Sequence, residues 1–197
     1  MGTRLVVPDL AHLPAYAEAL KRGWSPDNVR SAETAREHLA EIERDPEAFV
    51  RSLDDREARG EPIPMPDGTT VARLPGYFRW IFDGDDFCGA INFRWKPGTE
   101  GLPPYCPGHI GYAVVPWFRG RGHATAALRL LLPDAAREGL RYVEITTDPD
   151  NTASRRVIEA NGGVLHDEFM KPPSLGGTPS VRYRIGTLTQ APVGRSD

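Results

Sequence analysis

A short loop rich in glycine and arginine, residues 119–124, has the residue types that hold a phosphate group. A buried strand is predicted before this loop and a helix after it. Gly120 and Gly122 allow backbone N–H groups to point inward because they have no side chain in the way. Those N–H groups and the positive end of the helix dipole favour an anion such as a pyrophosphate. Arg119 and Arg121 add positive charge beside the same position.

Considered by itself, this loop does not identify one kind of site. Gly120 and Gly122 could begin a dinucleotide-binding fingerprint, but Thr125 stands where the third glycine is needed and the strand order is wrong for that fold. A phosphate loop of the GxxxxGK[ST] type is absent from the sequence. On the glycines alone, an ordinary strand-to-helix turn with two solvated arginines is the better interpretation.

A second strand-to-helix unit follows directly in the sequence. A strand is predicted over Tyr142–Thr147 and a helix over Asn151–Ala160. Asp150 or Asn151 can cap this helix, and Gly162 suits the left-handed position after its end. Two consecutive units, each with polar groups at the carboxyl end of its strand, predict a cleft between them.

Together the two units resemble the GNAT superfamily of N-acetyltransferases. The acetyl-CoA signature of that family, R/Q-x-x-G-x-G/A after a strand, is matched at every position by Arg119-Gly120-Arg121-Gly122-His123-Ala124. The N-x-x-A/S segment that family members carry downstream corresponds to Asn151-Thr152-Ala153-Ser154. The match covers about residues 108–165, and the part before residue 70 agrees only in having a strand and then helices.

The resemblance implies that acetyl-CoA is the cosubstrate and that it lies in a V-shaped gap between two splayed strands, His109–Val115 and Tyr142–Thr147. The pantetheine arm would hydrogen-bond to backbone groups of Val114 and Val115, and the pyrophosphate would lie on the amides of Arg119–Thr125. The residues so implied in cofactor binding are Val114, Val115, Arg119, Gly120, Arg121, Gly122, His123, Ala124, Thr125, Asn151 and Ser154. No metal is expected.

The resemblance also implies direct attack of an amine on the thioester carbonyl, so the chain needs no nucleophile of its own. The protein must position the amine, accept its proton, stabilise the oxyanion and protonate the departing thiolate. Many family members use a tyrosine on the second helix as that acid, but Ile158 stands at the corresponding position. Tyr183 or a water is therefore expected to replace it.

His109 is the expected general base. It begins the cofactor strand, and Gly111 and Ala113 follow on the same face, which leaves room for a ligand. An imidazole with an ordinary pKa of about 6.5 suits proton transfer near neutrality. The alternative is a histidine that is hydrogen-bonded at a strand start for structural reasons. Glu144 on the neighbouring strand is the second candidate.

The acceptor is expected to be a small-molecule amine or a peptide amine. Its place would be between the early helices and the hairpin, near four aromatic residues that are more often core than binding site: Trp24, Tyr77, Trp80 and Trp117. Two rival functions are a non-catalytic acyl-CoA-binding sensor or partner module, which Ile158 favours, and a nucleotide-dependent enzyme that uses the glycine loop.

The elements that must position these residues form a mixed α/β fold, with a GNAT-like central mixed sheet flanked by helices. The expected strands are Thr3–Val7, Tyr77–Phe82, Phe87–Trp95, His109–Val115, Tyr142–Thr147, Val164–Met170 and Val181–Ile185. The expected helices cover about Leu10–Arg22, a stretch that Ser31 caps, Pro46–Arg59, Gly122–Glu138 and Asn151–Ala160.

Two local features of these elements give sharper expectations. In the second strand of the hairpin, Phe87, Gly89, Ile91, Phe93 and Trp95 should share one face. In the first long helix after the glycine loop, Pro133 should cause a kink or a break, with a second piece that starts at Pro133.

Length and composition set the outer bounds. With 197 residues, of which 40% are hydrophobic, the chain is expected to form one domain over residues 1–185 and a disordered tail over 186–197. A net charge of −3 gives no basic field for nucleic acid. No segment is long and apolar enough for a membrane span, so a cytoplasmic monomer or homodimer is expected, with Cys88 and Cys106 reduced.

Overall fold

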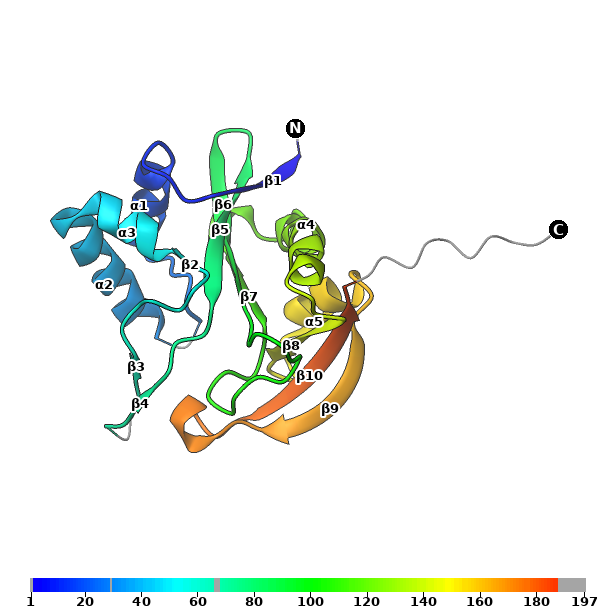
Figure 1. Ribbon diagram of the computed structural model, residues 1–197. Helices are drawn as coiled ribbons and strands as arrows, with labels where there is room; N and C mark the ends of the chain where they lie inside the picture. The colour runs from blue at the N-terminus through cyan, green and yellow to red at the C-terminus, as the bar shows by residue number, and fades with distance from the viewer. Residues whose placement is uncertain (1, 29, 66–67, 188–197) are drawn as a thin grey trace.

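Two antiparallel sheets meet at the strands β7 (Ile110–Val114) and β8 (Tyr142–Thr147), as Figure 1 shows. The computed structural model describes residues 2–28, 30–65 and 68–187. The order of the first sheet is β1-β5-β6-β7, with β2 also paired to β5, and the order of the second is β8-β10-β9. The expected mixed α/β fold is confirmed, although β7 and β8 are not joined in one continuous ladder.

Five of the remaining strands lie close to their predicted positions, and three short strands of two residues each were not predicted. They are β1 (Thr3–Val6), β2 (Asp54–Asp55), β3 (Ile63–Pro64), β4 (Thr70–Val71), β5 (Gly76–Asp83), β6 (Asp86–Arg94), β9 (Val164–Met170) and β10 (Pro179–Gly186). β3 and β4 form a small separate ladder. Residues 186 and 187 do not belong to a disordered tail, because Gly186 ends β10 and the Thr187 N–H donates to the Arg141 carbonyl at 3.1 Å. Residues 188–197 lie outside the described residues.

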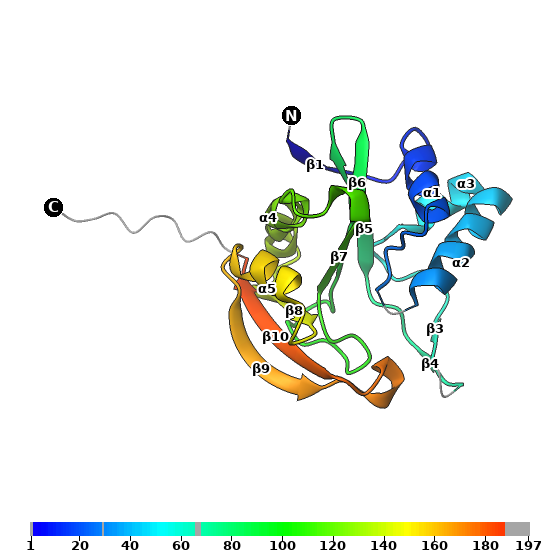
Figure 2. The ribbon, with the colours of Figure 1, turned by 180° about the vertical axis from the view of Figure 1, so that it is seen from behind.

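Helices cover both faces of the first sheet (Figures 1 and 2). On one face lie α1 (Leu13–Lys21), α2 (Ser31–Arg44) and α3 (Pro46–Ser52), and on the other lies α4 (His123–Arg137). Helix α5 (Thr152–Glu159) packs against α4 and against β8 of the second sheet. Two short 3₁₀ helices, η1 (Pro116–Phe118) and η2 (Pro173–Leu175), lie in loops. Each face therefore has its own apolar core: Trp80 and Phe82 pack toward α1, whereas Ile91 and Leu128 belong to the core under α4.

The N-terminal helices differ from prediction at their ends. Ser31 does not cap α2, because it is the first helical residue and Arg30 precedes it without a side-chain cap. Helix α3 ends at Ser52 and not near Arg59. The reason is a long-range contact: the Leu53 carbonyl accepts from the Phe78 N–H at 2.7 Å, and the chain then pairs with β5 as β2.

A β-bulge in β6 corrects the predicted alternation of its side chains. Gly89 pairs with Ile81 and Phe87 pairs with Phe82, so one extra residue lies on this strand. Phe87 therefore packs toward α1, whereas Ile91 and Phe93 face α4. The bulge needs a glycine, because a Cβ at Gly89 would lie 2.2 Å from the Ala113 carbonyl oxygen.

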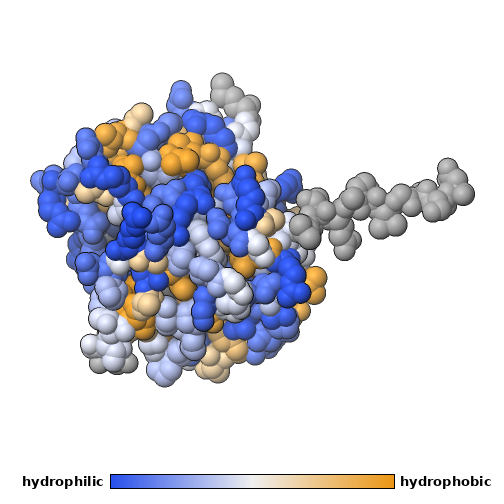
Figure 3. All heavy atoms as spheres, in the orientation of Figure 1, coloured by the Kyte–Doolittle hydropathy of each residue, from blue (hydrophilic) through white to orange (hydrophobic). Residues whose placement is uncertain are grey.

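The surface carries apolar side chains in scattered positions. Figure 3 shows hydrophilic residues interspersed with small apolar areas on the face of Figure 1. Val164 and Leu165, on the edge strand β9, are 70% and 44% exposed. Among the described residues, none of the helices has the length and apolar character that a membrane span requires.

The predicted break of α4 at Pro133 is wrong, because the helix runs from His123 to Arg137 with Pro133 inside it. A proline removes the N–H that would bond to the carbonyl four residues earlier, here that of Arg129. Both residues lie on the exposed face, where water can satisfy that carbonyl. Leu131 and Ala135, fully buried on the opposite face, hold the helix against the core.

Replacing Pro133 with Ala should raise the free energy of unfolding by about 1–2 kcal/mol, because Ala restores the missing N–H and has a higher helix propensity. Urea denaturation measures this change. Pro14→Ala is the matched control, since Pro14 is also exposed but lies in the first turn of α1, where its missing N–H has no helical partner. A Pro133→Ala protein no more stable than the wild type would contradict the expectation.

Candidate active site

The strands β7 and β8 touch at one end and separate toward the other. At the start of β7 the His109 N–H donates to the Glu144 carbonyl at 2.7 Å, and the Glu144 N–H donates to His109 Nδ1 at 2.9 Å. Beyond this point the two strands belong to different sheets. The helices α4 and α5 start after the separated carboxyl ends, so both helix N-termini lie at the open side.

The edge of β7 that faces β8 offers unpaired backbone groups. The Arg94 N–H donates to the His109 carbonyl, which fixes the hydrogen-bonded positions of the β6–β7 ladder at residues 109, 111 and 113. The N–H and C=O groups of Tyr112 and Val114 therefore point away from β6. Arg119 Nε donates to the Val114 carbonyl at 3.2 Å, so the Val114 N–H is the group left for a ligand.

Val115 differs from Val114 in this respect. Its N–H donates to the Cys88 carbonyl at 3.0 Å, and its carbonyl accepts from the Phe118 N–H at 3.0 Å. The family resemblance implied a ligand contact with the backbone of both valines. In this arrangement Val115 instead fixes the start of the glycine loop, and its side chain is fully buried.

The N-terminus of α4 presents backbone N–H groups without a side-chain cap. Gly122 is the N-cap residue with φ of 83°, and Gly120 has φ of 76°, a left-handed conformation that favours glycine. The first internal bond of the helix runs from the Ala126 N–H to the Gly122 carbonyl, so the N–H groups of residues 123–125 have no intrahelical acceptor. A Cβ at either glycine would meet nothing within 4 Å. An anion can therefore approach these N–H groups closely.

The side chains around this N-terminus are anchored in two ways. The guanidinium of Arg121 lies 4.9 Å from the ring centroid of Phe118. His123 is buried, and its Nδ1 lies 3.0 Å from Thr3 Oγ1 on β1. The His123 side chain thus ties α4 to the first sheet, and only its backbone N–H faces the anion position.

The N-terminus of α5 lies across from β7. Asn151 caps this helix as predicted, because its Oδ1 accepts from the Ser154 N–H at 3.0 Å. Ser154 Oγ lies 2.9 Å from the Tyr112 hydroxyl, which links α5 to β7. Burial raises the pKa of Tyr112 to about 12, so its phenol keeps its proton at neutral pH. Sequence reasoning missed Tyr112, although alternation along β7 places it on the face opposite to His109.

His109 is fully buried, and the one nitrogen of its neutral ring that can accept a hydrogen bond, Nδ1, already accepts one. Because Nδ1 accepts from the Glu144 N–H, the hydrogen of the neutral ring is on Nε2. Burial lowers the pKa of His109 to about 4. Nε2 has no hydrogen-bond partner among the described residues. In this tautomer the ring can donate a hydrogen bond but cannot accept a proton, so its role as a base stays a prediction that needs a rearranged ring.

Glu144 and Tyr183 lie on opposite faces of the second sheet. Glu144 Oε1 accepts from Arg184 Nε at 2.9 Å, and Oε2 lies 3.7 Å from Arg182 Nε. The Tyr183 hydroxyl accepts from Arg155 Nε at 2.9 Å and donates to Glu159 at 3.0 Å, under α5. The fold therefore brings His109 and Glu144 together but leaves Tyr183 away from them.

The other residues that the sequence singled out are mostly core residues. Ile158 is fully buried, and so is Trp80. Trp24 and Tyr77 are also buried, which agrees with aromatic residues of a core. Trp117 is half-buried and lies under the guanidinium of Arg22. The described residues contain no group of three or more His, Cys, Asp or Glu side chains that could hold a metal ion.

The sequence matches a family model for the acetyltransferase (GNAT) domain over residues 28–164. A curated relative, the L-2,4-diaminobutyric acid acetyltransferase of Streptomyces coelicolor, is 38% identical over 86 residues, which are 39% of this chain. The match spans about half of that relative, 51% of its length.

Solved structures share the fold across nearly the whole chain. The ribosomal L7/L12 α-N-protein acetyltransferase RimL, in complex with coenzyme A, has a TM-score of 0.61 at 19% identity and covers 93% of both chains. The microcin C7 self-immunity acetyltransferase MccE, in complex with acetyl-CoA and AMP, has a TM-score of 0.57 at 14% identity over 93% of this chain and 92% of its own. At these identities the likeness concerns the fold alone.

The buried, neutral His109 should make stability depend on pH. The pKa of this ring is about 4 in the folded protein and near its ordinary 6.5 in the unfolded chain. Between these pH values the unfolded chain binds more protons than the folded protein. The contribution of His109 to the free energy of unfolding should therefore be complete above pH 6.5 and be lost as the pH falls toward 4. The loss should be on the order of 1–3 kcal/mol.

Denaturation curves between pH 7.5 and 4 measure this dependence in the wild type and in His109→Gln. The Gln carbonyl can still accept from the Glu144 N–H, but it does not titrate. The difference between the two proteins therefore isolates His109 from the other histidines. Equal pH dependence of the two proteins would show that the ring is not held neutral by the fold.

Proposed function

This chain belongs to the GNAT acetyltransferase family, and from that premise we propose that it is an N-acetyltransferase that transfers the acetyl group of acetyl-CoA to a primary amine. The observation that carries the proposal is the uncapped N-terminus of α4, preceded by two glycines with positive φ, beside an edge of β7 that has separated from β8. This arrangement offers N–H groups to an anion and an open strand edge to an extended chain.

The residues present fit acetyl-CoA. The pyrophosphate would be held by the N–H groups of residues 120–125, with Arg119 and Arg121 beside them. The amide-bearing pantetheine arm would lie along β7, at the free N–H of Val114. On the opposite side Asn151 and Ser154 would contact that arm. Support for this assignment comes from the open space at both glycines and from the direction of the β7 edge.

The bound donor would supply an acetyl thioester, and the chain would supply position and proton transfer. The nitrogen of the acceptor forms a bond to the acetyl carbon, and the carbon–sulfur bond breaks. One proton leaves the nitrogen for a base of the protein or a water, and the sulfur takes up one proton from an acid. No covalent enzyme intermediate is required.

Glu144 is the proton acceptor that the geometry favours over His109. Its Oε2 has no hydrogen bond from Arg184, and its backbone adjoins the point where β7 and β8 meet. For the thiolate, the Tyr112 hydroxyl lies 2.9 Å from Ser154 Oγ, a residue expected to contact the pantetheine, whereas Tyr183 is hydrogen-bonded to two charged side chains elsewhere. Tyr112 is therefore the proton donor in this proposal, in place of Tyr183.

A second function has one observation in its favour. Ile158 occupies the position where the resemblance expects a tyrosine acid, and it is fully buried in the core. A chain without that acid could bind acyl-CoA without catalysis, as a sensor or partner module. Release of CoA thiol in the presence of an amine panel separates the two functions, because a binding module would hold acetyl-CoA without consuming it.

Replacing Gly122 with Glu should lower the affinity for CoA at least tenfold, or about 1.4 kcal/mol. The substitution adds negative charge at the pyrophosphate position and strains a backbone with φ of 83°. Isothermal calorimetry with CoA measures the change. Gly139→Glu is the matched control, because Gly139 has φ of 84° and open space at the other end of α4. Equal loss in both variants would point to strain alone and remove the pyrophosphate assignment.

Substitution of the two candidate bases should separate their roles. Glu144→Gln should lower kcat about 10²–10⁴-fold with little change in CoA affinity, whereas His109→Gln should keep most of the activity. Arg184→Gln serves as control, since it removes an ion-pair partner of Glu144 but no proton acceptor. If His109→Gln instead loses activity by that factor and Glu144→Gln does not, His109 is the base and its ring must turn in the bound state.

A further inference from the structure

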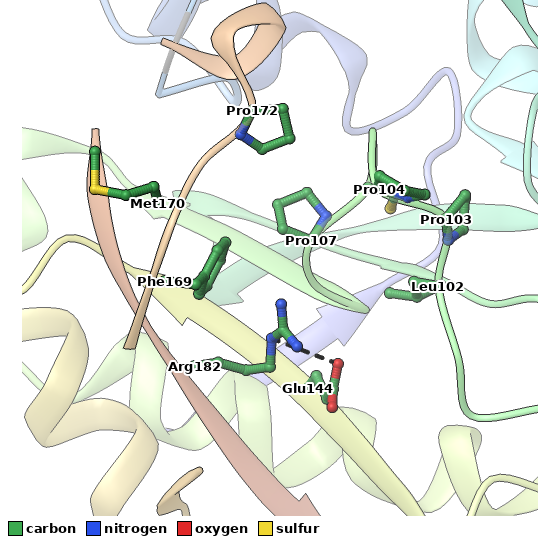
Figure 4. Close-up of a pocket in the computed structure, with 10 residues that line it drawn as sticks. Leu102, Pro103, Pro104, Pro107, Glu144, Phe169, Met170, Pro172 and Arg182 are labelled. Atoms are coloured by element: carbon green, nitrogen blue, oxygen red, sulfur yellow. Dashed lines mark ion pairs between the residues drawn. The ribbon is translucent and has the colours of Figure 1, made fainter. Parts of the chain in front are cut away.

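A cavity of about 320 Å³ lies over the second sheet, on the face away from α4 and α5. Figure 4 shows its lining, which comes from the loop before β7, from β8, β9 and β10, and from the segment after β9. The walls are largely proline and other apolar side chains, among them Pro103, Pro107 and Phe169. The charged residues of the lining are Glu144 and Arg182.

Arg182 directs its guanidinium into this cavity. Figure 4 shows it between Phe169 and Glu144, with the loop at Pro107 beyond it. The guanidinium carbon lies 4.6 Å from the Phe169 ring centroid, a contact that fixes the plane of the fork. The register of β10 against β9 shifts between Arg182 and Tyr183, and such a bulge re-aims the side chains beside it.

Arg182 forms long ion pairs with Glu144 and Asp167, but its side chain makes no hydrogen bond within the described part of the chain. Its Nε lies 3.7 Å from both Glu144 Oε2 and Asp167 Oδ1, which is too long for a hydrogen bond. That Nε is buried without a partner. Arg184, by contrast, makes two 2.9 Å contacts to Glu144 Oε1. A buried donor without an acceptor costs about 1–3 kcal/mol, so Arg182 is set to gain from an incoming acceptor atom.

We propose that this cavity binds the carboxylate of the acceptor, so that the amine this chain acetylates is carried by a free amino acid. A guanidinium fork matches a carboxylate in shape and charge. Glu144, beside it, complements the amino group and adjoins the junction of β7 with β8. The inference rests on the proposed acetyl transfer, since it assigns the acceptor of that same reaction.

Size and charge favour an amino acid over a peptide N-terminus. A cavity of about 320 Å³ is at the small end of ligand pockets. In a peptide the carboxyl group beside the terminal amine is an amide, which has no charge to pair with Arg182. A site built for a charged group rejects an analogue that lacks it, because its buried polar atoms stay unpaired.

The test compares free acids with their amides. Alanine, lysine and 2,4-diaminobutyrate, each as the free acid and as the C-terminal amide, are assayed for release of CoA thiol together with a short peptide. In the wild type, kcat/KM for at least one free acid should exceed that for its amide tenfold or more, through KM. Arg182→Gln should bring this ratio close to one, and Arg182→Lys should keep part of it. Arg51→Gln, an exposed ion-pair residue on α3, should leave the ratio unchanged.

Calorimetry of the CoA-saturated protein with the same acids and amides gives a second measurement that needs no turnover. Equal or better acetylation of amides or peptide, or a preference that survives in Arg182→Gln, overturns the carboxylate site and leaves acetyl transfer intact. Tighter binding of free acids that Arg182→Gln abolishes, without acetylation of any acceptor, upholds the site and overturns the proposed function. Absence of both acetylation and binding overturns both.

Discussion

The fold depends on a single junction, where the start of β7 meets the middle of β8. The backbones of His109 and Glu144 face each other there, and the His109 ring accepts the Glu144 N–H. An ordinary ladder bond would continue along both strands and close the space between them. The imidazole instead replaces the next carbonyl as acceptor, so the bonding ends after one residue. Beyond this point each strand keeps one edge unpaired, which is costly unless a ligand or water bonds to it.

The open edges are useful because two helices begin beside them. Helix α4 has no side-chain cap, whereas the Asn151 side chain caps α5. The uncapped end keeps its N–H groups for an anion, and the capped end offers hydroxyl and amide groups instead. One side of the gap is thus suited to a charged phosphate group and the other to a neutral polar chain. This asymmetry is what a ligand with a pyrophosphate at one end and an amide-bearing arm at the other requires.

Local signals predicted much of this arrangement. The positive φ of Gly120 and Gly122, the Asn151 cap and the ranges of β8 and β9 depend on residues close in sequence, so these local features could be inferred. Apart from the N-terminus of α2, where Ser31 is the first helical residue and not the cap, the errors in the elements came from contacts distant in sequence. The bulge at Gly89 arises from its closeness to Ala113, and α3 ends early because Leu53 bonds to Phe78. Pro133 stays helical because the core on the opposite face outweighs its local preference.

The pairing of Glu144 with two arginines also depends on contacts between residues distant in sequence. The sequence shows Arg182 and Arg184 alternating with buried residues on β10, but only the register with β8 places Arg184 opposite Glu144 and Arg182 two residues away on the same face. In that register, the backbone and the side chain of Glu144 have separate structural roles. The backbone of Glu144 helps to form the junction that separates the strands. Its side chain hydrogen-bonds to Arg184 and forms only a longer ion pair with Arg182. Because the same residue touches the gap and the cavity, a ligand in the cavity lies beside the place where the strands part. A substitution at Glu144 therefore acts on both, whereas one at Arg182 acts on the cavity alone.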